Sequence, residues 1–244
     1  MKLALLDRLL STGRAGTPIA LATHLASGTQ SLVTSEKIEG DLALDDGAVA
    51  EVRRALDDDR SRVIEAPNGS VFVEVFNPRL RLIVVGAVHT AQELVPLARL
   101  AGYEVAVVDP RTAFATPERF PETVLRNDWP AEAFAALKPD RRTAVVTLSH
   151  DPKIDDPALA AALNSEAFYV GALGSRRTHA KRLERLRAAG LDPAALARIR
   201  APVGLAIGAL TPAEIAISIM AEITAVLRRA PLGGSSNAAA KHTP

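Results

Sequence analysis

Short runs of β-branched residues alternate with apolar segments of helical spacing between residues 80 and 170. This alternation is typical of βαβ units, whose parallel strands form one sheet with helices packed on its faces. Because crossovers between parallel strands are right-handed, the pattern predicts an open, doubly wound α/β domain. The predicted strands are RLIVV at 81–85, YEVAVVD at 103–109, TVLRN at 123–127, TAVVTLS at 143–149 and AFYVGAL at 167–173.

A different pattern precedes residue 79. An amphipathic helix is expected in the first 16 residues, and Asn68-Gly69 is a strong signal for a two-residue hairpin loop. We therefore expect a small α+β domain at 1–78 ahead of a Rossmann-like domain at 79–230. Residues 231–244 are rich in Gly, Ser and Ala and are predicted to form a disordered tail. The strand candidates of the first domain are 18–26, 30–36, 61–67 and 70–76, and its second helix candidate is 47–58.

Composition narrows the class of protein. The 244 residues are 48% hydrophobic and 23% charged, which suits one large core or two modest ones. The formal net charge of +1 lacks the basic excess of a general nucleic-acid binder. No cysteine is present, so disulfides, thiolate metal ligands and a cysteine nucleophile are excluded for this chain. No apolar stretch approaches the roughly 20 residues of a membrane span, so we expect a cytoplasmic protein.

The sequence LIVVGAVHTAQEL has the layout of a dinucleotide-binding turn, in which three glycines connect a strand to a helix. Gly86 takes the first glycine position, Val88 the second and Ala91 the third. The second glycine normally lets the backbone approach a pyrophosphate, so Val88 alters the central contact point. His89 opens the helix, where its ring would either lie near a bound anion or serve as a cap.

Asp109 ends the second predicted strand, where an acidic side chain usually binds a ribose diol. Arg111 follows two positions later and belongs to the same candidate site. The alternative is that Asp109 and Pro110 begin a turn while Arg111 points to solvent. The presence of the whole unit from Gly86 to Asp109 favours the ligand contact.

The consecutive residues Ser149, His150 and Asp151 follow another predicted strand. Three neighbours in sequence cannot hydrogen-bond in the nested order of a catalytic triad, which is defined by its geometry in space. Their position still matters, because open α/β sheets bind ligands beyond the carboxyl ends of their strands. His150 and Asp151 are therefore candidates for ligand contact, with loop capping as the alternative.

The segment GALGSRRTHAKR predicts an anion-binding turn. Gly171 and Gly174 permit a tight passage from strand to helix, Ser175 is a candidate N-cap, and Arg176 and Arg177 stand at the helix start. Backbone N–H groups and guanidinium groups would together bind an anion. An ordinary basic helix is the alternative. Arginines at a helix N-terminus oppose the helix dipole, however, and this favours an anionic ligand.

The last long block is PVGLAIGALTPAEIAISIMAEI. Glu214, three residues after a threonine N-cap, predicts a capping box. Gly204 and Gly208 lie in the apolar loop before the helix, and Glu214, Ser218 and Glu222 share one helix face. We predict that Gly204, Gly208 and Glu214 shape a ligand pocket, the alternative being an ordinary solvated helix face.

Five blocks in this order carry a resemblance to a known family: VVGAVHTAQEL, VVDPRTAFATPERFP, TLSHD, YVGALGSRRTHAKR and PVGLAIGALTPAEIAISIMAEI. From about residue 80 to residue 229 the chain resembles the xanthine dehydrogenase accessory protein (XdhC/CoxI) family. The preceding segment resembles a shortened form of that family's N-terminal domain. The chain departs from the family at Val88 in the glycine-alanine-glycine-histidine turn, at Ala206 in place of an aspartate, and in lacking the N-terminal glycine-glycine-cysteine motif.

The resemblance implies a chaperone rather than an enzyme. Such a protein binds the molybdenum cofactor, as molybdopterin or its dinucleotide form, helps equip it with a sulfido ligand and delivers it to a molybdenum hydroxylase. The implied partners are a hydroxylase of the xanthine dehydrogenase type and a sulfurtransferase, although without cysteine this chain itself cannot relay sulfur. We expect a homodimer with no nucleic-acid or membrane partner, and we assign no catalytic or metal-binding residue.

The alternative is an NAD(P)-dependent oxidoreductase, because a Rossmann-like fold does not fix function. Val88 argues against it, as does the lack of an obvious tyrosine-lysine pair that could donate a proton beside the nicotinamide. NAD(P) is therefore not expected as the cofactor.

Overall fold

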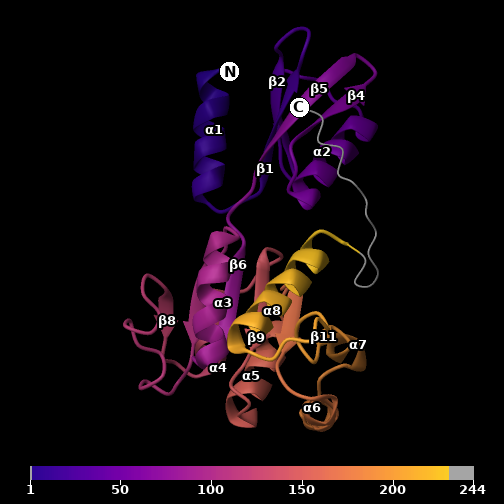
Figure 1. The fold of residues 1–244 in the computed structure, drawn as a ribbon. Coiled ribbons are helices and arrows are strands. Elements are labelled where there is room, and N and C mark those ends of the chain that lie inside the picture. The colour runs from indigo at the N-terminus through magenta and orange to yellow at the C-terminus, as the bar shows by residue number, and fades with distance from the viewer. Residues whose placement is uncertain (1, 231–244) are drawn as a thin grey trace. The chain divides into compact units, whose positions relative to one another are not determined.

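The computed structural model describes residues 2–230, so the predicted tail at 231–244 lies outside the described residues. The chain divides into two compact units, the first ending at Pro78 and the second beginning at Arg79 (Figure 1). Each unit has its own sheet.

The first unit is an antiparallel sheet in the order β3-β2-β1-β5-β4, with one helix on each face. Strand β1 is central, and its apolar side chains alternate between the faces. Ile19 and Leu21 pack with helix α1, whereas Ala20 and Ala22 pack with helix α2. The elements are α1 (Leu3–Arg14), β1 (Ile19–His24), β2 (Gln30–Val33), β3 (Ile38–Gly40), α2 (Asp46–Asp58), β4 (Arg62–Ala66) and β5 (Gly69–Phe76).

The predicted hairpin forms, but its loop lies one residue earlier than expected. Ala66 pairs with Gly69, so the two loop residues are Pro67 and Asn68 rather than Asn68 and Gly69. The Asn68 carbonyl lies 2.9 Å from Nε2 of His24, and a Cβ on Gly69 would come within 2.8 Å of the same ring atom. Contact with His24 therefore accounts for glycine at the first position of β5.

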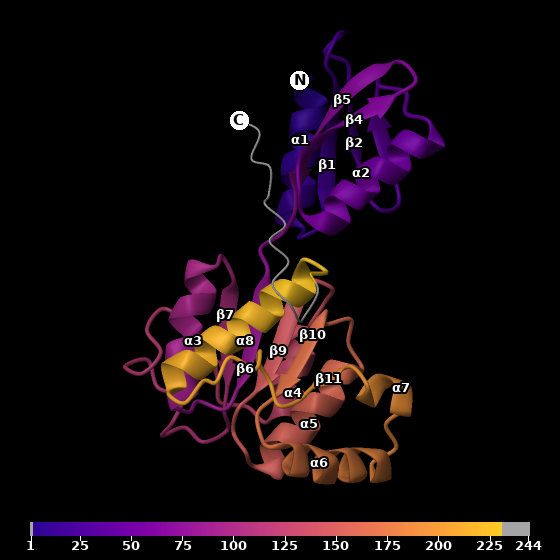
Figure 2. The same cartoon turned by 45° about the vertical axis from the view of Figure 1, so that its right-hand side comes forward.

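The second unit is a six-stranded parallel sheet in the order β11-β10-β9-β6-β7-β8. Helices cover both faces, as Figure 2 shows, which confirms the predicted doubly wound fold. The elements are β6 (Arg81–Val85), α3 (His89–Leu100), β7 (Glu104–Val108), β8 (Val124–Arg126), α4 (Pro130–Leu137), β9 (Thr143–Thr147), α5 (Pro152–Leu163), β10 (Tyr169–Ala172), α6 (Arg176–Ala188), α7 (Pro193–Leu196), β11 (Ile199–Arg200) and α8 (Pro212–Leu227).

Two apolar cores sandwich this sheet. Leu82 and Val84 of β6 join the core formed with α3 and α8, whereas Ile83 and Val85 join the core formed with α4 and α5. A parallel strand covered on both faces must be apolar throughout, which explains the unbroken run in β6. The chain passes from β6 to β7 and β8 on one side and returns to β9 on the other. The carboxyl ends of β6 and β9 therefore mark the switch point where such sheets bind ligands.

Candidate functional site

The turn after β6 is closed by packing against the loop after β9. Gly86 has φ 102°, and a Cβ there would lie 2.6 Å from the amide nitrogen of Ser149. Only glycine fits both the backbone conformation and the close approach. Val88 is the N-cap of α3 with φ −92°, an ordinary backbone conformation, and its side chain packs on the core beneath α3. The turn thus keeps its glycine at the first position, while the second position carries a partly buried side chain that packs on the core.

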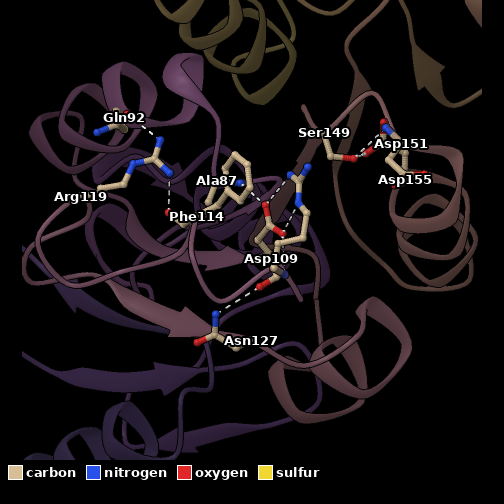
Figure 3. A network of polar contacts seen from close by, with 10 residues as sticks. Ala87, Gln92, Asp109, Phe114, Arg119, Asn127, Ser149, Asp151 and Asp155 are labelled. Atoms are coloured by element: carbon tan, nitrogen blue, oxygen red, sulfur yellow. Dashed lines mark hydrogen bonds and ion pairs between the residues drawn. The ribbon is translucent and has the colours of Figure 1, made fainter.

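Asp109 and Arg111 form a clasp across this turn, through hydrogen bonds from Ala87 and Arg111 to the carboxylate of Asp109. Figure 3 shows Asp109 beside Ala87. The fully buried carboxylate of Asp109 accepts hydrogen bonds from the Ala87 amide at 2.8 Å and from the Arg111 amide at 3.0 Å. The Arg111 guanidinium adds two more at 2.9 and 2.8 Å and lies 4.4 Å from the centre of the Phe114 ring. Burial by itself would raise the pKa of Asp109, but the hydrogen bonds from Arg111 and Ala87 outweigh it and lower the pKa. Both carboxylate oxygens are therefore engaged by the protein itself, which leaves the predicted ribose contact without a free acceptor.

The loop after β9 carries a buried hydroxyl and carboxyl pair. Ser149 Oγ donates to Asp155 Oδ1 at 2.7 Å and accepts from the Asp151 amide at 3.2 Å. Burial raises the pKa of Asp155, although Ser149 and Arg182 partly offset this effect. Asp151 is the N-cap of α5, and its carboxylate accepts a hydrogen bond from the Lys153 amide at 2.9 Å. The carboxylate therefore caps the helix, as the alternative interpretation expected. Asp155 was not among the expected site residues.

Two exposed histidines stand at the ends of these loops. His89 is the first residue of α3, as predicted from the sequence. His150 has φ 62°, a left-handed conformation that is uncommon outside glycine and often marks functional loops. Both rings lie at the carboxyl edge of the sheet and face solvent, where a ligand could reach them.

The turn after β10 has the predicted helix cap. Gly174 has φ 133°, and Ser175 accepts a hydrogen bond from the Thr178 amide at 3.1 Å as the N-cap of α6. Arg176 and Arg177 are both exposed at the start of this helix. These residues occupy the positions that an anion-binding turn requires.

Gly171 is not part of that turn, contrary to the sequence prediction. It lies inside β10, where a Cβ would come within 2.5 Å of Val203 Cγ2 and 2.8 Å of the Tyr169 ring. The glycine is required because the loop after β11 packs directly on the strand. Gly171 therefore serves packing, and the turn to α6 begins two residues later.

A cavity of about 150 Å³ lies between the first turns of α5 and α6, and we call it the α6 cavity. The Arg182 side chain is only 3% exposed and donates through Nη2 to the Leu173 carbonyl at 2.8 Å. Its Nε and Nη1 atoms are buried without a hydrogen-bond partner, and Asp155 Oδ2, also unpartnered, lies 3.9 Å from Nη2. The cavity is lined by His150, Pro152, Asp155, Arg177, Thr178, Lys181, Arg182 and Arg185.

The loop before α8 is held by a carboxylate that the sequence prediction did not select. Buried Glu222 accepts from the Tyr169 hydroxyl at 2.5 Å and from the Gly204 amide at 2.9 Å, and Arg200 lies 3.8 Å away. Burial raises the pKa of Tyr169, so its hydroxyl stays protonated and donates. The shared helix face of Glu214, Ser218 and Glu222 was the available signal for this site.

The three residues chosen from this loop have different roles. Gly204 has φ 94°, and a Cβ there would lie 2.3 Å from Ser218 Oγ, so loop and helix are in direct contact. Gly208 has φ 78° and open surroundings. Glu214 is exposed and completes the predicted capping box, in which its carboxylate accepts from the Leu210 and Thr211 amides. These contacts engage Glu214 in shaping the loop.

Four of the residue blocks described above follow the carboxyl ends of adjacent strands β7, β6, β9 and β10, and the loop with Gly204 follows β11, which lies next to β10. The family model of the XdhC Rossmann domain matches residues 82–223, more than half of the chain. The chain belongs to this family. The match contains every candidate site residue from Gly86 to Glu214, and it confirms the resemblance found in the sequence.

Relatives of this XdhC-family chain are longer than the chain itself. Over 171 residues it is 37% identical to the uncharacterized protein YqeB of Escherichia coli, covering 67% of this chain and 30% of YqeB. Over 151 residues it is 35% identical to the molybdenum cofactor insertion chaperone PaoD of the same organism, covering 62% of this chain and 41% of PaoD. The chain thus spans less than half the length of these relatives.

A solved structure shares the fold of this XdhC-family chain. The crystal structure of a xanthine dehydrogenase from Bacillus halodurans superposes with a TM-score of 0.69 and 25% sequence identity. The superposition covers 96% of this chain and 66% of that one. Within residues 2–230, no helix has the length and apolar character needed to cross a membrane. The same residues contain no group of three or more His, Asp or Glu side chains placed to hold a metal ion.

Proposed function

We propose that this chain binds the molybdenum cofactor and helps its maturation and insertion into a molybdenum hydroxylase such as xanthine dehydrogenase. The observation that carries the proposal is the match to the XdhC Rossmann domain, which contains all the candidate site residues. Its similarity to PaoD, named as a molybdenum cofactor insertion chaperone, supports the same role. The cofactor is cargo here, taken up as molybdopterin or its dinucleotide form and then released.

The carboxyl edge of the sheet suits a cargo with an anionic organic part. Two helices, α5 and α6, begin there and direct the positive ends of their dipoles toward it. Buried Arg182 has guanidinium atoms without partners, and the exposed His89 and His150 can donate hydrogen bonds to a polar ligand. The chain has no cysteine, so we propose that it holds the cofactor through the pterin and phosphate parts rather than through molybdenum.

The proposed setting is the cytoplasm, with an apo-hydroxylase as the acceptor. A sulfurtransferase is the proposed second partner, because this chain has no thiol that could carry sulfur to the cofactor. We propose that the protein acts as a homodimer, which sedimentation of the purified protein would establish.

The first test is the pterin content of the protein itself. The chain, produced in cells that synthesise the cofactor and purified without oxygen, should retain pterin that becomes fluorescent after oxidation. Protein from cells unable to make the cofactor is the matched control and should give none. Equal background fluorescence in both preparations, from protein shown to be folded, would contradict the proposal.

The alternative as an NAD(P)-dependent oxidoreductase predicts a different ligand. The clasp between Asp109 and Arg111 already engages the carboxylate that would bind the ribose. We therefore expect NAD to bind weakly or not at all, and Val88→Gly alone should not create a site, because the clasp remains. Calorimetry with NAD and NADP on both proteins makes the comparison, and sub-micromolar affinity in the unaltered protein would support the oxidoreductase instead.

A further inference from the structure

The α6 cavity contains a charged group whose hydrogen-bonding capacity is largely unused. Of the three guanidinium nitrogens of Arg182, only Nη2 has a hydrogen-bond acceptor, the Leu173 carbonyl. The nearest carboxylate oxygen, on Asp155, is 3.9 Å away. Burying polar groups without partners costs free energy, so such groups are retained where something else satisfies them. Arg182 lines the cavity, but Nε and Nη1 are covered in this structure, so a ligand inside would accept from them only after neighbouring side chains shift.

The charges around the cavity favour an anion. Four cationic side chains and one carboxylate line it. Arg185 is paired with Asp156 at 2.5 and 3.0 Å, and Arg182 faces Asp155. Burial raises the pKa of Asp155, the one carboxylate of the lining. Arg177 and Lys181 form no ion pair within residues 2–230, so their charge is available at the cavity mouth.

The size of the cavity limits what can enter. Pockets for complete small molecules occupy about 300 to 1,000 Å³, whereas this cavity measures about 150 Å³. It can therefore accept one functional group of a larger ligand. A tetrahedral group with several acceptor oxygens suits guanidinium donors, which make short, charge-assisted hydrogen bonds to phosphate.

We propose that the α6 cavity binds a terminal phosphate group, with Arg182 as its buried anchor and Arg177 and Lys181 closing over it. The identity of that phosphate rests on the proposed function, which makes it the phosphate end of the pterin cargo. A terminal phosphate is favoured over a bridging one because it offers three free acceptor oxygens to the cationic donors, whereas a bridging phosphate offers two. The pterin would then extend from the mouth beside His150.

Two adjacent arginines provide a matched test. Arg176 and Arg177 are both exposed in the first turn of α6, but only Arg177 lines the cavity. Non-specific attraction of an anion to the positive surface would depend equally on Arg176 and Arg177, whereas binding in the α6 cavity depends on Arg177. Arg182→Met removes the buried guanidinium while keeping an apolar stem. Arg182→Met removes the unpartnered nitrogens, but it also removes the donor to the Leu173 carbonyl and the cation opposite Asp155, so we expect a lower thermal stability and check that the variant is folded before binding is measured.

The experiment measures binding of methyl phosphate and dimethyl phosphate by calorimetry at constant ionic strength, which sodium chloride maintains. The intact protein should bind methyl phosphate, and dimethyl phosphate more weakly. Arg182→Met and Arg177→Ala should each weaken methyl phosphate binding by about tenfold or more, whereas Arg176→Ala should change it by less than about twofold. Lys181→Ala gives an independent check should Arg182→Met fail to fold.

Two results would overturn the proposal: no methyl phosphate binding by the intact protein, or equal losses from Arg176→Ala and Arg177→Ala. Pterin content of the same variants separates this inference from the proposed function. If the Arg182→Met protein carries as much pterin as the intact one, the cavity does not hold the cargo, yet the carrier function stands. If phosphate binds in the predicted pattern but no protein carries pterin, the anion site stands and the carrier function fails.

Discussion

Replacement of Glu222 by alanine should lower the free energy of unfolding by about 3 kcal/mol or more, because each donor left without its acceptor costs about 1 to 3 kcal/mol. Two donors lose their acceptor in this variant, the Tyr169 hydroxyl and the Gly204 amide. Tyr169 is 2% exposed, so water cannot easily replace the carboxylate. Denaturant unfolding measures the change, and the loop at Gly204 should become more open to proteolysis.

Glu214→Ala is the matched control on the same helix. Glu214 is exposed and accepts only from two amides of the loop, so water can take its place and the loss should be much smaller. Equal effects of the two substitutions would show that the buried network does not hold this loop. Tyr169→Phe should fall between them, because the hydroxyl is removed while Glu222 keeps the Gly204 amide.

Five of the six strands of the second unit could be predicted, most of them because they are covered on both faces, whereas the two-residue strand β11 was missed. Such strands are apolar where they are covered, as β6 is from Leu82 to Val85, and right-handed connections favour the doubly wound arrangement. The strand β9 ends at Thr147, two residues earlier than predicted, and apolar Leu148 and then Ser149 belong to the loop that follows. The close approach of Ser149 to Gly86 ends the strand there, and only the folded structure contains that contact.

Helix α5 could not be predicted from periodicity. It includes Pro152 and Pro157, and proline usually ends a helix because it lacks an amide donor. Here Pro152 stands at the first position, where no donor is needed. Pro157 lies inside the helix, yet neighbouring Ala158 and Leu159 are fully buried in the core. Tertiary packing therefore outweighs the local preference.

In the candidate site, too, features with a local sequence signal could be predicted, and features set by tertiary contacts could not. Gly86, Gly174 and Ser175 were recognisable because special backbone angles and caps leave local signals. Arg182 was not, since it belongs to a run of basic residues that resembles a solvated helix face, and its burial depends on contacts from α5 and the Leu173 carbonyl. Likewise Glu222 resembles Glu214 in sequence, although one is buried and the other caps the helix.

The largest functional effect is expected when the chain is absent. Cells that lack it, and have no second copy of the family, should still make the hydroxylase polypeptide but with little pterin and little activity. We expect this because, in the proposed function, this chain carries the cofactor to the apo-hydroxylase. Normal activity in such cells would mean that the hydroxylase acquires its cofactor by another route.

The most direct measurement follows that step with purified proteins. Apo-hydroxylase from cells lacking this chain is mixed with the pterin-loaded chain, and pterin in the re-isolated hydroxylase is measured together with its activity. Pterin should leave the chain, appear in the hydroxylase and restore activity in proportion, whereas the chain from cofactor-deficient cells should restore none. Pterin that stays on the chain, or activity restored equally by the unloaded chain, would contradict the proposed function.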